Sequence, residues 1–452
     1  MSVSAMDSRI FRNLFGTREI RDVFTDEAYV SRMIETEAAL ARAESEVGVI
    51  PKDAGEMISR ALRDVKIDFD RLSSETDIVG YPVLPLIKQL VEQTPPEHAK
   101  YIHWGATTQD IMDDASMLQI REGLKIIRRE LERLEMVLAK SAEKYKDTPM
   151  AGRTHLQHAL PCTWGYKCAV YLSSIVRHLQ RLTEIESRTL MVQFGGAAGT
   201  LASLGPSTDG VKVRAALARE LSLDDPPITW HVARDNVAEI LNFLGLLGGT
   251  LGKVAYDLIV MSSNELGEVS EPFVPHRGAS STMPQKRNPI SSEVILAASK
   301  LLRANAGLGL DAMVVDFERA SGPWHLEWVA IPEAFVLAVG SLHQANFALG
   351  GLVVNTRAMT NNLHSTKGLI VGEAVMMGLA PHVGRQRAHD IVYDACRVAI
   401  ETETNLVDVL KQNQDVMKAL DNTTSKVEEL CDPLNYLGAS QIMVDRVLED
   451  VR

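Results

Sequence analysis

The sequence predicts an all-α fold, and three observations support that prediction. Between 117 and 138, apolar residues recur three and four positions apart over three heptads, with Arg, Glu and Lys filling most intervening positions. These apolar residues are Met117, Ile120, Leu124, Ile127, Leu131, Leu134 and Leu138. A second segment repeats the spacing at Leu172, Ile175, Leu179 and Leu182, and 237–266 is apolar around most of its circumference. No convincing run of alternating apolar and polar residues predicts a strand.

The first expected helix lies near the N-terminus. Thr25 is a plausible N-cap, and Asp26 and Glu27 follow in the first turn, where the helix dipole favours anions. The helix is expected to run to Gly48 and to stop before Pro51.

The rest of the chain divides by its pattern of helices and breaks. Between 70 and 116 the sequence is expected to be rich in loops, and 110–350 is expected to form a long helical bundle with one helix starting at Pro289. From 351 onward, shorter helices are expected, separated by Asn361-Asn362, Gly368, Pro381 and Pro433. The predicted domains are therefore 1–109, 110–350 and 351–452.

Charge and composition restrict the class of protein. The 452 residues carry a formal net charge of −12, whereas nucleic-acid binders are more often basic, so no nucleic-acid partner is expected. An anionic substrate must therefore be held by local cations. The 4 cysteines include no CxxC pair and are expected to be reduced thiols.

The sequence also predicts where the protein is located. The N-terminal stretch MSVSAMDSRIFRNLFG lacks the apolar core of a signal peptide, which favours a cytoplasmic location. The longest apolar stretch, 240–252, is too short to span a bilayer and is interpreted as a buried core helix, so no membrane partner is expected.

Three polar segments interrupt the helical pattern and are the candidates for chemistry. They are HWGATTQD at 103–110, GRTHLQHALP at 152–161 and GASSTMPQKRNP at 278–289. Each also has a purely structural interpretation, because a short motif alone has a high false-positive rate.

These structural interpretations rest on ordinary helix chemistry. Thr107, Thr108 and Asp110 could cap the long helix that follows them. His155 could be an interfacial histidine at a helix start, and Asn288 could cap a helix whose first residue is a proline.

Taken together, the three segments resemble the fumarase/aspartase superfamily. GASSTMPQKRNP with Glu293 matches the superfamily signature SSxMPxKxNxxxxE at every fixed position, and the other two segments resemble its remaining signature regions in the expected order. The resemblance covers essentially the whole chain. It implies a three-domain, all-helical subunit that forms a homotetramer around a twenty-helix core, with each active site built from regions of three subunits. It also implies a small polycarboxylate substrate and no cofactor.

The resemblance implies a specific reaction type. Enzymes of the superfamily add or remove a group β to a carboxylate, through a doubly negative aci-carboxylate that needs cations and donors around it. By resemblance, Ser280 is the base, and its alkoxide needs a neighbouring cation and backbone donors. Lys286 and Asn288 would bind the substrate carboxylate. The loop from about 275 to 287 would close over substrate.

The other two segments would complete the site. By resemblance, His155 acts as general acid to the leaving group or orients it, because histidine has a pKa near neutrality. Thr154 and Gln157 would bind substrate, and Thr107 and Thr108 would offer hydroxyls to a second carboxylate.

The sequence favours one branch of the superfamily over another. The adenylosuccinate lyase branch shares GRTH and SSTMPxKRNP, but its Arg-Tyr pair is missing from FRNLFGTREIRDVFTDE, and its loop histidine is missing from SSETDIVGYP at 73–82. Four segments are similar to the 3-carboxy-cis,cis-muconate cycloisomerase branch, which closes or opens a lactone and implies a role in aromatic catabolism. They are FERASGPWHLEW at 317–328, TWHVARDNVAE at 229–239, EAALARAE at 37–44 and DPLNYLGAS at 432–440.

Several alternatives stay open. His155 can be lacking in known cycloisomerases of that branch, so its presence keeps open a lyase that releases fumarate from an amino- or iminosuccinate. Arg319 and His325 could contact the distal part of substrate or form a polar seam between helices. His231 and Arg234 could form a buried polar cluster or contact substrate.

Weaker signals favour structural roles. GGAAGT at 195–200 is not GxGxxG and is interpreted as a turn or close helix packing. His155 and His158 have no evident third partner, so no metal site is expected. A non-catalytic, crystallin-like structural protein is the remote alternative to an enzyme.

Overall fold

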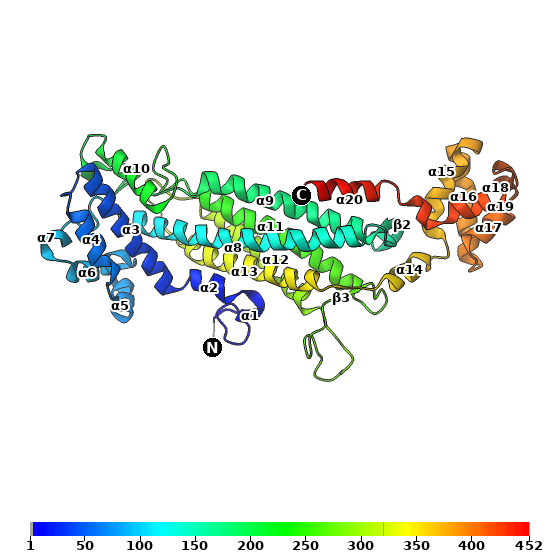
Figure 1. Cartoon of the computed structure of the whole chain (residues 1–452), viewed down its shortest axis with the longest axis horizontal. Coiled ribbons are helices and arrows are strands. Elements are labelled where there is room, and N and C mark those ends of the chain that lie inside the picture. Colours follow the sequence, from blue (N-terminus) through cyan, green and yellow to red (C-terminus); the bar gives the residue numbers. More distant parts are fainter. Residues whose placement is uncertain (1–2, 320, 452) are drawn as a thin grey trace. The chain divides into compact units, whose positions relative to one another are not determined.

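The computed structural model describes residues 3–319 and 321–451, and helices dominate it (Figure 1). The all-α prediction is therefore confirmed for the described residues. Residues 1, 2, 320 and 452 lie outside the description, so the segment 317–328 is described except for position 320. The chain divides into two compact units, and five long helices contribute residues to both. These helices are α8 (Thr108–Lys144), α9 (Trp164–Thr189), α11 (Asp235–Met261), α12 (Ile290–Asp311) and α13 (His325–Gly350).

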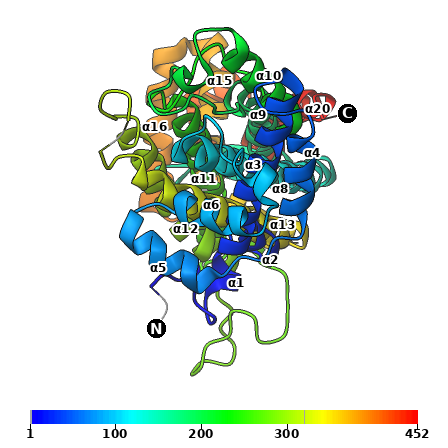
Figure 2. The ribbon, with the colours of Figure 1, turned by 90° about the vertical axis from the view of Figure 1, so that its left-hand side faces the viewer.

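Unit 1 comprises 1–130, 179–251 and 297–343. Within it α3 packs against α4 and α10. Figure 2 shows these three helices from the left-hand side of Figure 1. Besides its parts of the long helices, its elements are α1 (Arg12–Phe15), α2 (Arg18–Val23), α3 (Asp26–Val47), α4 (Ala54–Arg63), α5 (Phe69–Val79), α6 (Val83–Glu92), α7 (Pro96–Ala99), η1 (Ala202–Leu204) and α10 (Asp209–Leu221).

Unit 2 comprises 131–178, 252–296 and 344–452. Its short helices enclose an apolar cluster that includes Leu379, Leu406 and Leu410. Besides its parts of the long helices, its elements are β1 (Pro149–Thr154), β2 (Gln157–Thr163), β3 (Val269–Ser270), β4 (Val353–Val354), α14 (Thr356–His364), η2 (Leu369–Val371), α15 (Gly372–Val383), α16 (Arg385–Glu401), α17 (Leu406–Gln412), α18 (Gln414–Ala419), α19 (Thr424–Cys431), η3 (Pro433–Tyr436) and α20 (Ser440–Glu449).

The clearest sequence signals correspond to the observed helices. Thr25 caps α3, because its side chain accepts a hydrogen bond from the amide of Ala28, and Gly48 ends the helix in the left-handed conformation with φ 87°. All seven apolar residues of the 117–138 pattern lie on α8 and are at most 1% exposed. The apolar pattern therefore identified the buried side of α8 correctly.

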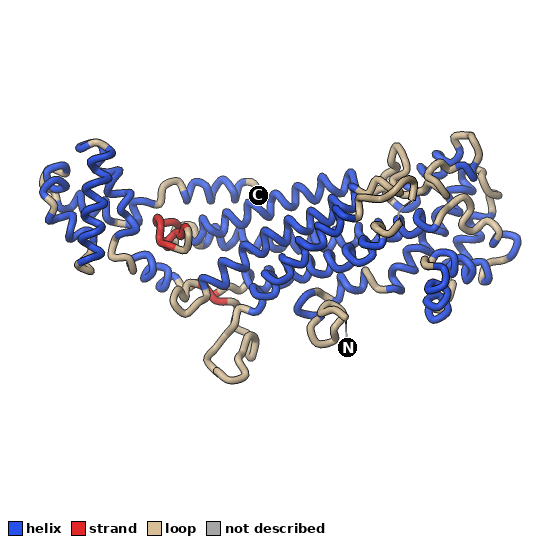
Figure 3. The backbone as a smooth tube through the Cα atoms, turned by 180° about the vertical axis from the view of Figure 1, so that it is seen from behind, coloured by secondary structure: helices blue, strands red, loops and turns tan. Residues whose placement is uncertain are grey.

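Two expectations about local structure are wrong. The region 70–116 contains α5, α6 and α7 rather than mostly loops; α5 buries only Leu72, so it shows no apolar periodicity. The sequence also predicted no strand, yet β1 and β2 form an antiparallel hairpin within the second polar segment (Figure 3). These strands are too short, and too interrupted by the bulge between Ala151 and Arg153, to show regular alternation.

Shorter helices do follow residue 351, but two of the predicted breaks lie inside helices. Asn361 and Asn362 belong to α14, where the Asn362 side chain donates hydrogen bonds to Leu266 O and Glu268 Oε1. Pro381 lies in the last turn of α15, where its ring can be accommodated near the helix end. The division into three domains remains a prediction.

Two helices, α11 and α13, are long and apolar enough to cross a membrane by length and composition alone. Within their most apolar windows, 50% and 67% of residues are buried, and the core helix of a soluble protein passes the same test. Leu241, Leu244 and Leu247 are fully buried, as expected for a core helix over 240–252.

Candidate functional site

The first polar segment ends at a buried carboxylate that collects four donors in unit 1. Asp110 Oδ2 accepts hydrogen bonds from the amides of Thr107 at 2.9 Å and Gly196 at 3.0 Å. Asp110 Oδ1 accepts from the amide of Gly195 at 3.0 Å and lies 2.6 Å from His231 Nε2. Asp110 therefore does cap the start of α8, one of the interpretations left open, and the same carboxylate also anchors the start of GGAAGT.

Thr107 and Thr108 lie at the start of α8 and are half-buried. The Thr107 carbonyl accepts from the Asp110 amide at 3.0 Å, so backbone and side chain fix this turn reciprocally. Among the described residues, neither threonine hydroxyl makes a hydrogen bond. Both hydroxyls are therefore held in place while their own hydrogen-bonding capacity is unused.

Arg319 is bound to the same part of unit 1. Its guanidinium donates to Gln109 Oε1 at 2.9 Å, Gly196 O at 3.2 Å and Ala197 O at 2.6 Å. Gln109 in turn donates to the carbonyl of His231 at 2.9 Å. Arg319 and Asp110 thus hold opposite sides of GGAAGT, through its carbonyls and its amides respectively.

His231 and Arg234 belong to a buried polar cluster, which was one of the two interpretations left open. They are 3% and 2% exposed. Arg234 donates to Asp113 Oδ2 at 2.8 Å and to Glu327 Oε1 at 2.9 Å. Burial raises the pKa of Glu327, although the adjacent Arg234 guanidinium opposes that shift. The ionic interactions therefore join α8 and α13 through Arg234, the residue just before α11, inside unit 1.

His325, by contrast, is exposed and lies against aromatic rings. Its ring centroid is 4.2 Å from that of Trp328 and 5.8 Å from that of Tyr81. Tyr81 also stacks on Trp324 with centroids 5.9 Å apart. FERASGPWHLEW therefore presents an aromatic cluster rather than a polar seam at this histidine.

The second polar segment forms the tip of the β1–β2 hairpin in unit 2. Thr154 pairs with Gln157, and the two residues between them, His155 and Leu156, have φ of 51° and 62°. A two-residue turn with both φ values positive matches the twist of a hairpin but usually contains Asn and Gly. Thr154, His155 and Gln157 are all exposed at this tip.

The base of the hairpin is fixed by a buried ion pair. Arg153 donates to both oxygens of Glu268, at 2.9 and 2.7 Å, and the Glu268 side chain is fully buried. Burial, followed by the charge of Arg153, lowers the pKa of the neighbouring His158. His158 is therefore neutral near pH 7. Among the described residues it belongs to no group of side chains that could hold a metal ion.

The third polar segment is a loop in which the half-buried Ser280 accepts hydrogen bonds from backbone amides. Ser280 Oγ accepts hydrogen bonds from the amides of Thr282 at 3.2 Å and Met283 at 3.1 Å, and lies 3.3 Å from Thr282 Oγ1. Lys286 is exposed, and Asn288 is half-buried. The sequence identified the amides of this loop as candidate donors to the serine, and they do reach it.

The ends of this loop are joined across Gly278 and Asn288. The Asn288 amide donates to Gly278 O at 2.9 Å, and Ala279 and Arg287 form an antiparallel bridge. Gly278 has φ 70°, and a Cβ there would lie 2.3 Å from Asn288 O. Only glycine fits this conformation and this close approach.

The residues that fix α12 behind the loop were not found from the sequence. Glu271 Oε1 accepts from the amide and hydroxyl of Ser292, each at 2.8 Å, and Glu271 Oε2 accepts from the Ser291 amide at 3.2 Å. Arg277 donates to Ser291 Oγ at 2.6 Å. α12 begins at Ile290, so the predicted Asn288 cap lies one residue too early, and Glu271 provides the cap instead. No motif marks Glu271, because its partners lie twenty residues away.

These features coincide with a family match. The family described as "Lyase" matches residues 16–302, and the region described as "Adenylosuccinate lyase C-terminus" matches 368–447. The first match covers more than half of the chain. The chain belongs to the lyase family, that of the fumarase/aspartase enzymes.

Individual members of the lyase family are similar over nearly the whole chain. Trans-aconitate decarboxylase 1 from Mycosarcoma maydis is 45% identical over 96% of this chain and 88% of the relative. A 3-carboxy-cis,cis-muconate cycloisomerase from Acinetobacter baylyi is 41% identical over 98% and 99%. The crystal structure of a fumarate lyase from Mesorhizobium sp. BNC1 matches with a TM-score of 0.90 at 52% identity, over 96% and 98%. The resemblance inferred from the sequence is therefore confirmed.

Within this lyase-family chain, the expected site residues fall into three groups. Unit 1 holds Thr107, Thr108 and Arg319 around one polar network. Unit 2 holds two further groups, one at the hairpin tip and one in the loop. They are Thr154, His155 and Gln157, and Ser280, Lys286 and Asn288. Over residues 3–319 and 321–451, no hydrogen bond or ion pair links one group to another.

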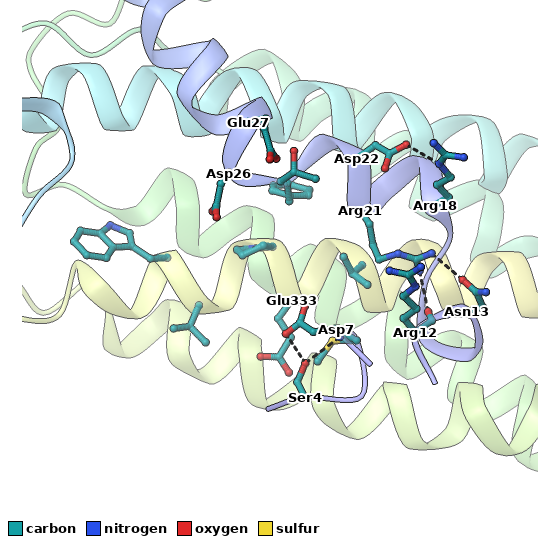
Figure 4. A pocket seen from close by; sticks show the side chains of 17 residues that line it. Ser4, Asp7, Arg12, Asn13, Arg18, Arg21, Asp22, Asp26, Glu27 and Glu333 are labelled. Carbon is teal, nitrogen blue, oxygen red and sulfur yellow. Dashed lines mark hydrogen bonds and ion pairs between the residues drawn. The ribbon is translucent and has the colours of Figure 1, made fainter. Parts of the chain in front are cut away.

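A cavity of about 1000 Å³ in unit 1 is lined partly by residues of FRNLFGTREIRDVFTDE (Figure 4). This is the segment in which the Arg-Tyr pair of the adenylosuccinate lyase branch is missing. Arg21 faces this cavity, but its guanidinium donates to Arg12 O at 2.9 Å, Gly16 O at 3.0 Å and Asn13 Oδ1 at 2.8 Å. Asp26 and Glu27 line the same cavity. Arg21 thus holds the turn between α1 and α2. In the described part of the chain, no group of three or more His, Cys, Asp or Glu side chains could hold a metal ion.

Proposed function

We propose that this protein catalyses addition or elimination β to a carboxylate, acting as a 3-carboxy-cis,cis-muconate cycloisomerase. The observation that carries the proposal is the environment of Ser280, whose Oγ accepts two backbone hydrogen bonds. A free serine is a very weak base, and two amide donors stabilise the negative charge of its alkoxide. The Lys286 side chain makes no hydrogen bond or ion pair with the other described residues, so it remains available as the neighbouring cation.

Ser280 in this proposal removes the carbon-bound proton next to a carboxylate. The electron pair that remains spreads into that carboxylate, which becomes the doubly negative aci form. Lys286 contributes a positive charge and Asn288 two amide donors, so both stabilise this intermediate more than the substrate. For lactone opening, the carbon–oxygen bond β to the carboxylate then breaks; lactone closure is the reverse addition.

His155 is proposed to protonate or orient the leaving oxygen, because it is exposed at a hairpin tip and reaches beyond its own strands. Thr154 and Gln157 flank it as substrate-binding residues. Thr107 and Thr108 are proposed to bind a second carboxylate with hydroxyls that have no other partner in the described chain. Arg319 contributes by holding the Gly196 and Ala197 carbonyls.

A lyase that releases fumarate is the second candidate. His155 is the observation that favours it, since a general acid assists the departure of a poor leaving group such as an amine. The similar structure of a fumarate lyase also supports a fumarate-releasing activity. The two candidates share the carboxylate end of the site and differ in the group that leaves.

The proposed assembly is a cytoplasmic homotetramer in which three subunits build each active site. The three groups of site residues have no mutual bonds within the described chain, so each is available to a neighbouring subunit. α11 also leaves Leu246 57% and Tyr256 49% exposed. Packing of α11 against other copies would bury them.

The proposal is tested by turnover of a panel of substrates followed by absorbance. Loss or gain of the conjugated muconate band would identify the cycloisomerase, and appearance of fumarate from N-substituted aspartates would identify the lyase. Ser280→Ala should reduce kcat at least about a thousandfold, as expected for loss of the proton-abstracting group. Its thermal unfolding should change little, because Ser280 is half-buried and its Oγ has partners only within its own loop. Gln285→Ala, at an exposed position in this loop, is the matched control; equal turnover in both variants would reject Ser280 as the base.

A further inference from the structure

Unit 2 contains a cavity of about 570 Å³ beside the hairpin, and apart from His155 its lining residues have no part in the proposed mechanism. Its walls come from β1 and the hairpin tip, from α9 and from α11. His155 lies at its edge through the hairpin tip, and three cations line it. They are Arg153, Lys167 and Lys253.

The charge of this cavity is not balanced. Arg153 is neutralised by its bidentate pair with buried Glu268. Lys167 and Lys253 both bind the same oxygen of Asp257, Lys167 at 2.7 Å. Two ammonium groups and one carboxylate leave one net positive charge at this wall.

The two lysines also retain unused hydrogen-bonding capacity. Each ammonium group carries three donors, and Asp257 is the only acceptor that either contacts in the described residues. Asp257 already receives a third donor, the hydroxyl of Tyr171. A second carboxylate would balance the charge and accept the remaining donors.

Arg319, which the sequence suggested for the distal part of substrate, makes three hydrogen bonds within unit 1. Arg319 directs its donors to Gln109 Oε1 and to the carbonyls of Gly196 and Ala197. Two of the similar enzymes are named for tricarboxylates, trans-aconitate and 3-carboxy-cis,cis-muconate. The proposed mechanism assigns two of the three carboxylates, one to the loop and one to Thr107 and Thr108.

We propose that the cavity beside the hairpin is a subsite for the third carboxylate of a tricarboxylate substrate, bound by Lys253 and Lys167. The inference rests on the proposed function for the identity of the substrate. The subsite itself rests on the cavity, the excess of positive charge and the adjacency to His155. In this proposal, Lys167 and Lys253 allow the protein to bind tricarboxylates more tightly than dicarboxylates such as succinate.

The test is a binding measurement by titration calorimetry on the assembled full-length protein. Tricarballylate, a saturated tricarboxylate, and succinate, which lacks its third carboxylate, are the probes. Lys253→Met should weaken tricarballylate binding about tenfold or more, as expected for a lost charge-assisted hydrogen bond, and should change succinate binding less than about twofold. Lys253→Arg should restore most of the affinity, and Lys300→Met, at an exposed lysine of α12, should change neither.

Equal weakening of both probes by Lys253→Met, or no effect on either, would overturn the subsite, as would a wild-type protein that binds tricarballylate no better than succinate. Lys253 is 58% exposed in the single subunit and lines the cavity together with Tyr256, which the proposed assembly would cover, so light scattering on the variant is needed to separate a binding effect from a change of assembly. Failure of the proposed function is distinguishable, because Ser280→Ala removes turnover but not the lysine-dependent preference for tricarballylate. An enzyme that turns over none of the panel could still show that preference.

Discussion

A single buried carboxylate, Asp110, organises the first polar segment. Four donors reach its two oxygens, and they come from three separate parts of unit 1: the turn at Thr107, the start of GGAAGT and His231. Because the Thr107 amide is one of these donors, the carboxylate positions the hydroxyls proposed to bind substrate. Asp110 is therefore expected to act through Thr107 rather than by touching substrate.

Asp110→Asn tests this role. Asparagine retains one acceptor oxygen and turns an NH₂ group toward the other donors, so at least two of the four bonds are lost. Each buried unsatisfied group costs about 1–3 kcal/mol, so the free energy of unfolding should fall by about 2–4 kcal/mol. Urea unfolding measures this, with exposed Asp77→Asn as the control. Similar stability of the two variants would contradict the proposed anchor.

Glu44 on α3 predicts a pH dependence of stability. It is fully buried, and neither carboxyl oxygen has a hydrogen-bond partner in the described chain. Burial, followed by the charge of Glu37, raises the pKa of Glu44 from 4.5 to about 9. Between these values the unfolded chain loses this proton and the folded chain keeps it. The contribution of Glu44 to stability should therefore be complete below pH 4.5 and fall as pH rises toward about 9.

Glu44→Gln should remove this part of the pH dependence, because glutamine matches the neutral acid in shape and does not ionise. Its stability relative to the wild type should increase with pH, by at most about 1.4 kcal/mol per pH unit. Urea unfolding midpoints measured across the range would show this. A difference that stays constant with pH would mean that Glu44 is ionised in the folded protein.

At the scale of elements, the sequence predicts helices whose patterns arise within the helix itself. The cap at Thr25, the stop at Gly48 and the apolar residues of 117–138 depend only on nearby residues, and all appear as expected. α5 escaped detection because a helix that buries only Leu72 has almost no apolar pattern. The hairpin escaped because its turn contains His155 and Leu156 in place of the usual Asn and Gly.

The candidate site shows the same limit at the level of contacts. Signature matching located Ser280, and the amides of Thr282 and Met283 follow from its local turn. The role of Glu271 as the cap of α12, and the binding of Arg319 to GGAAGT, join residues far apart in sequence. Such pairings depend on tertiary packing, for which a single sequence carries no periodic signal.

The loop that carries Ser280 is an element whose closure depends on Gly278. Gly278→Ala would place a Cβ 2.3 Å from Asn288 O in a conformation with φ 70°, so the bond between the loop ends should be lost. We expect kcat/KM to fall at least about tenfold, since Ser280 and Lys286 would lose their fixed positions. The free energy of unfolding should change by no more than about 1 kcal/mol because the loop is exposed.

Gln285→Ala, within the same loop and exposed, is again the matched control. Steady-state kinetics and thermal unfolding would be measured for both variants. Activity of Gly278→Ala equal to that of the control would show that closure of the loop ends is not required for turnover.

At the scale of the whole molecule, the proposed tetramer explains why the three groups of site residues have no bonds to one another in the described chain. A site assembled from several subunits must place residues of its groups where a neighbouring subunit can reach them, as observed for the exposed His155 and Lys286. This arrangement has a consequence that a site contained in one subunit lacks. Two inactive variants can complement each other when their subunits mix.

Mixing Ser280→Ala with His155→Ala subunits tests the assembly directly. Each variant alone should have little activity, because every site lacks one of the two groups. After joint unfolding and reassembly at equal concentration, about a quarter of the sites should combine an intact Ser280 from one subunit with an intact His155 from another. Activity of the mixture should therefore rise well above that of either parent, whereas parents reassembled separately and then combined should show no gain. If both residues of a site came from the same subunit, no mixed tetramer would contain an intact site, and the mixture would remain as inactive as its parents.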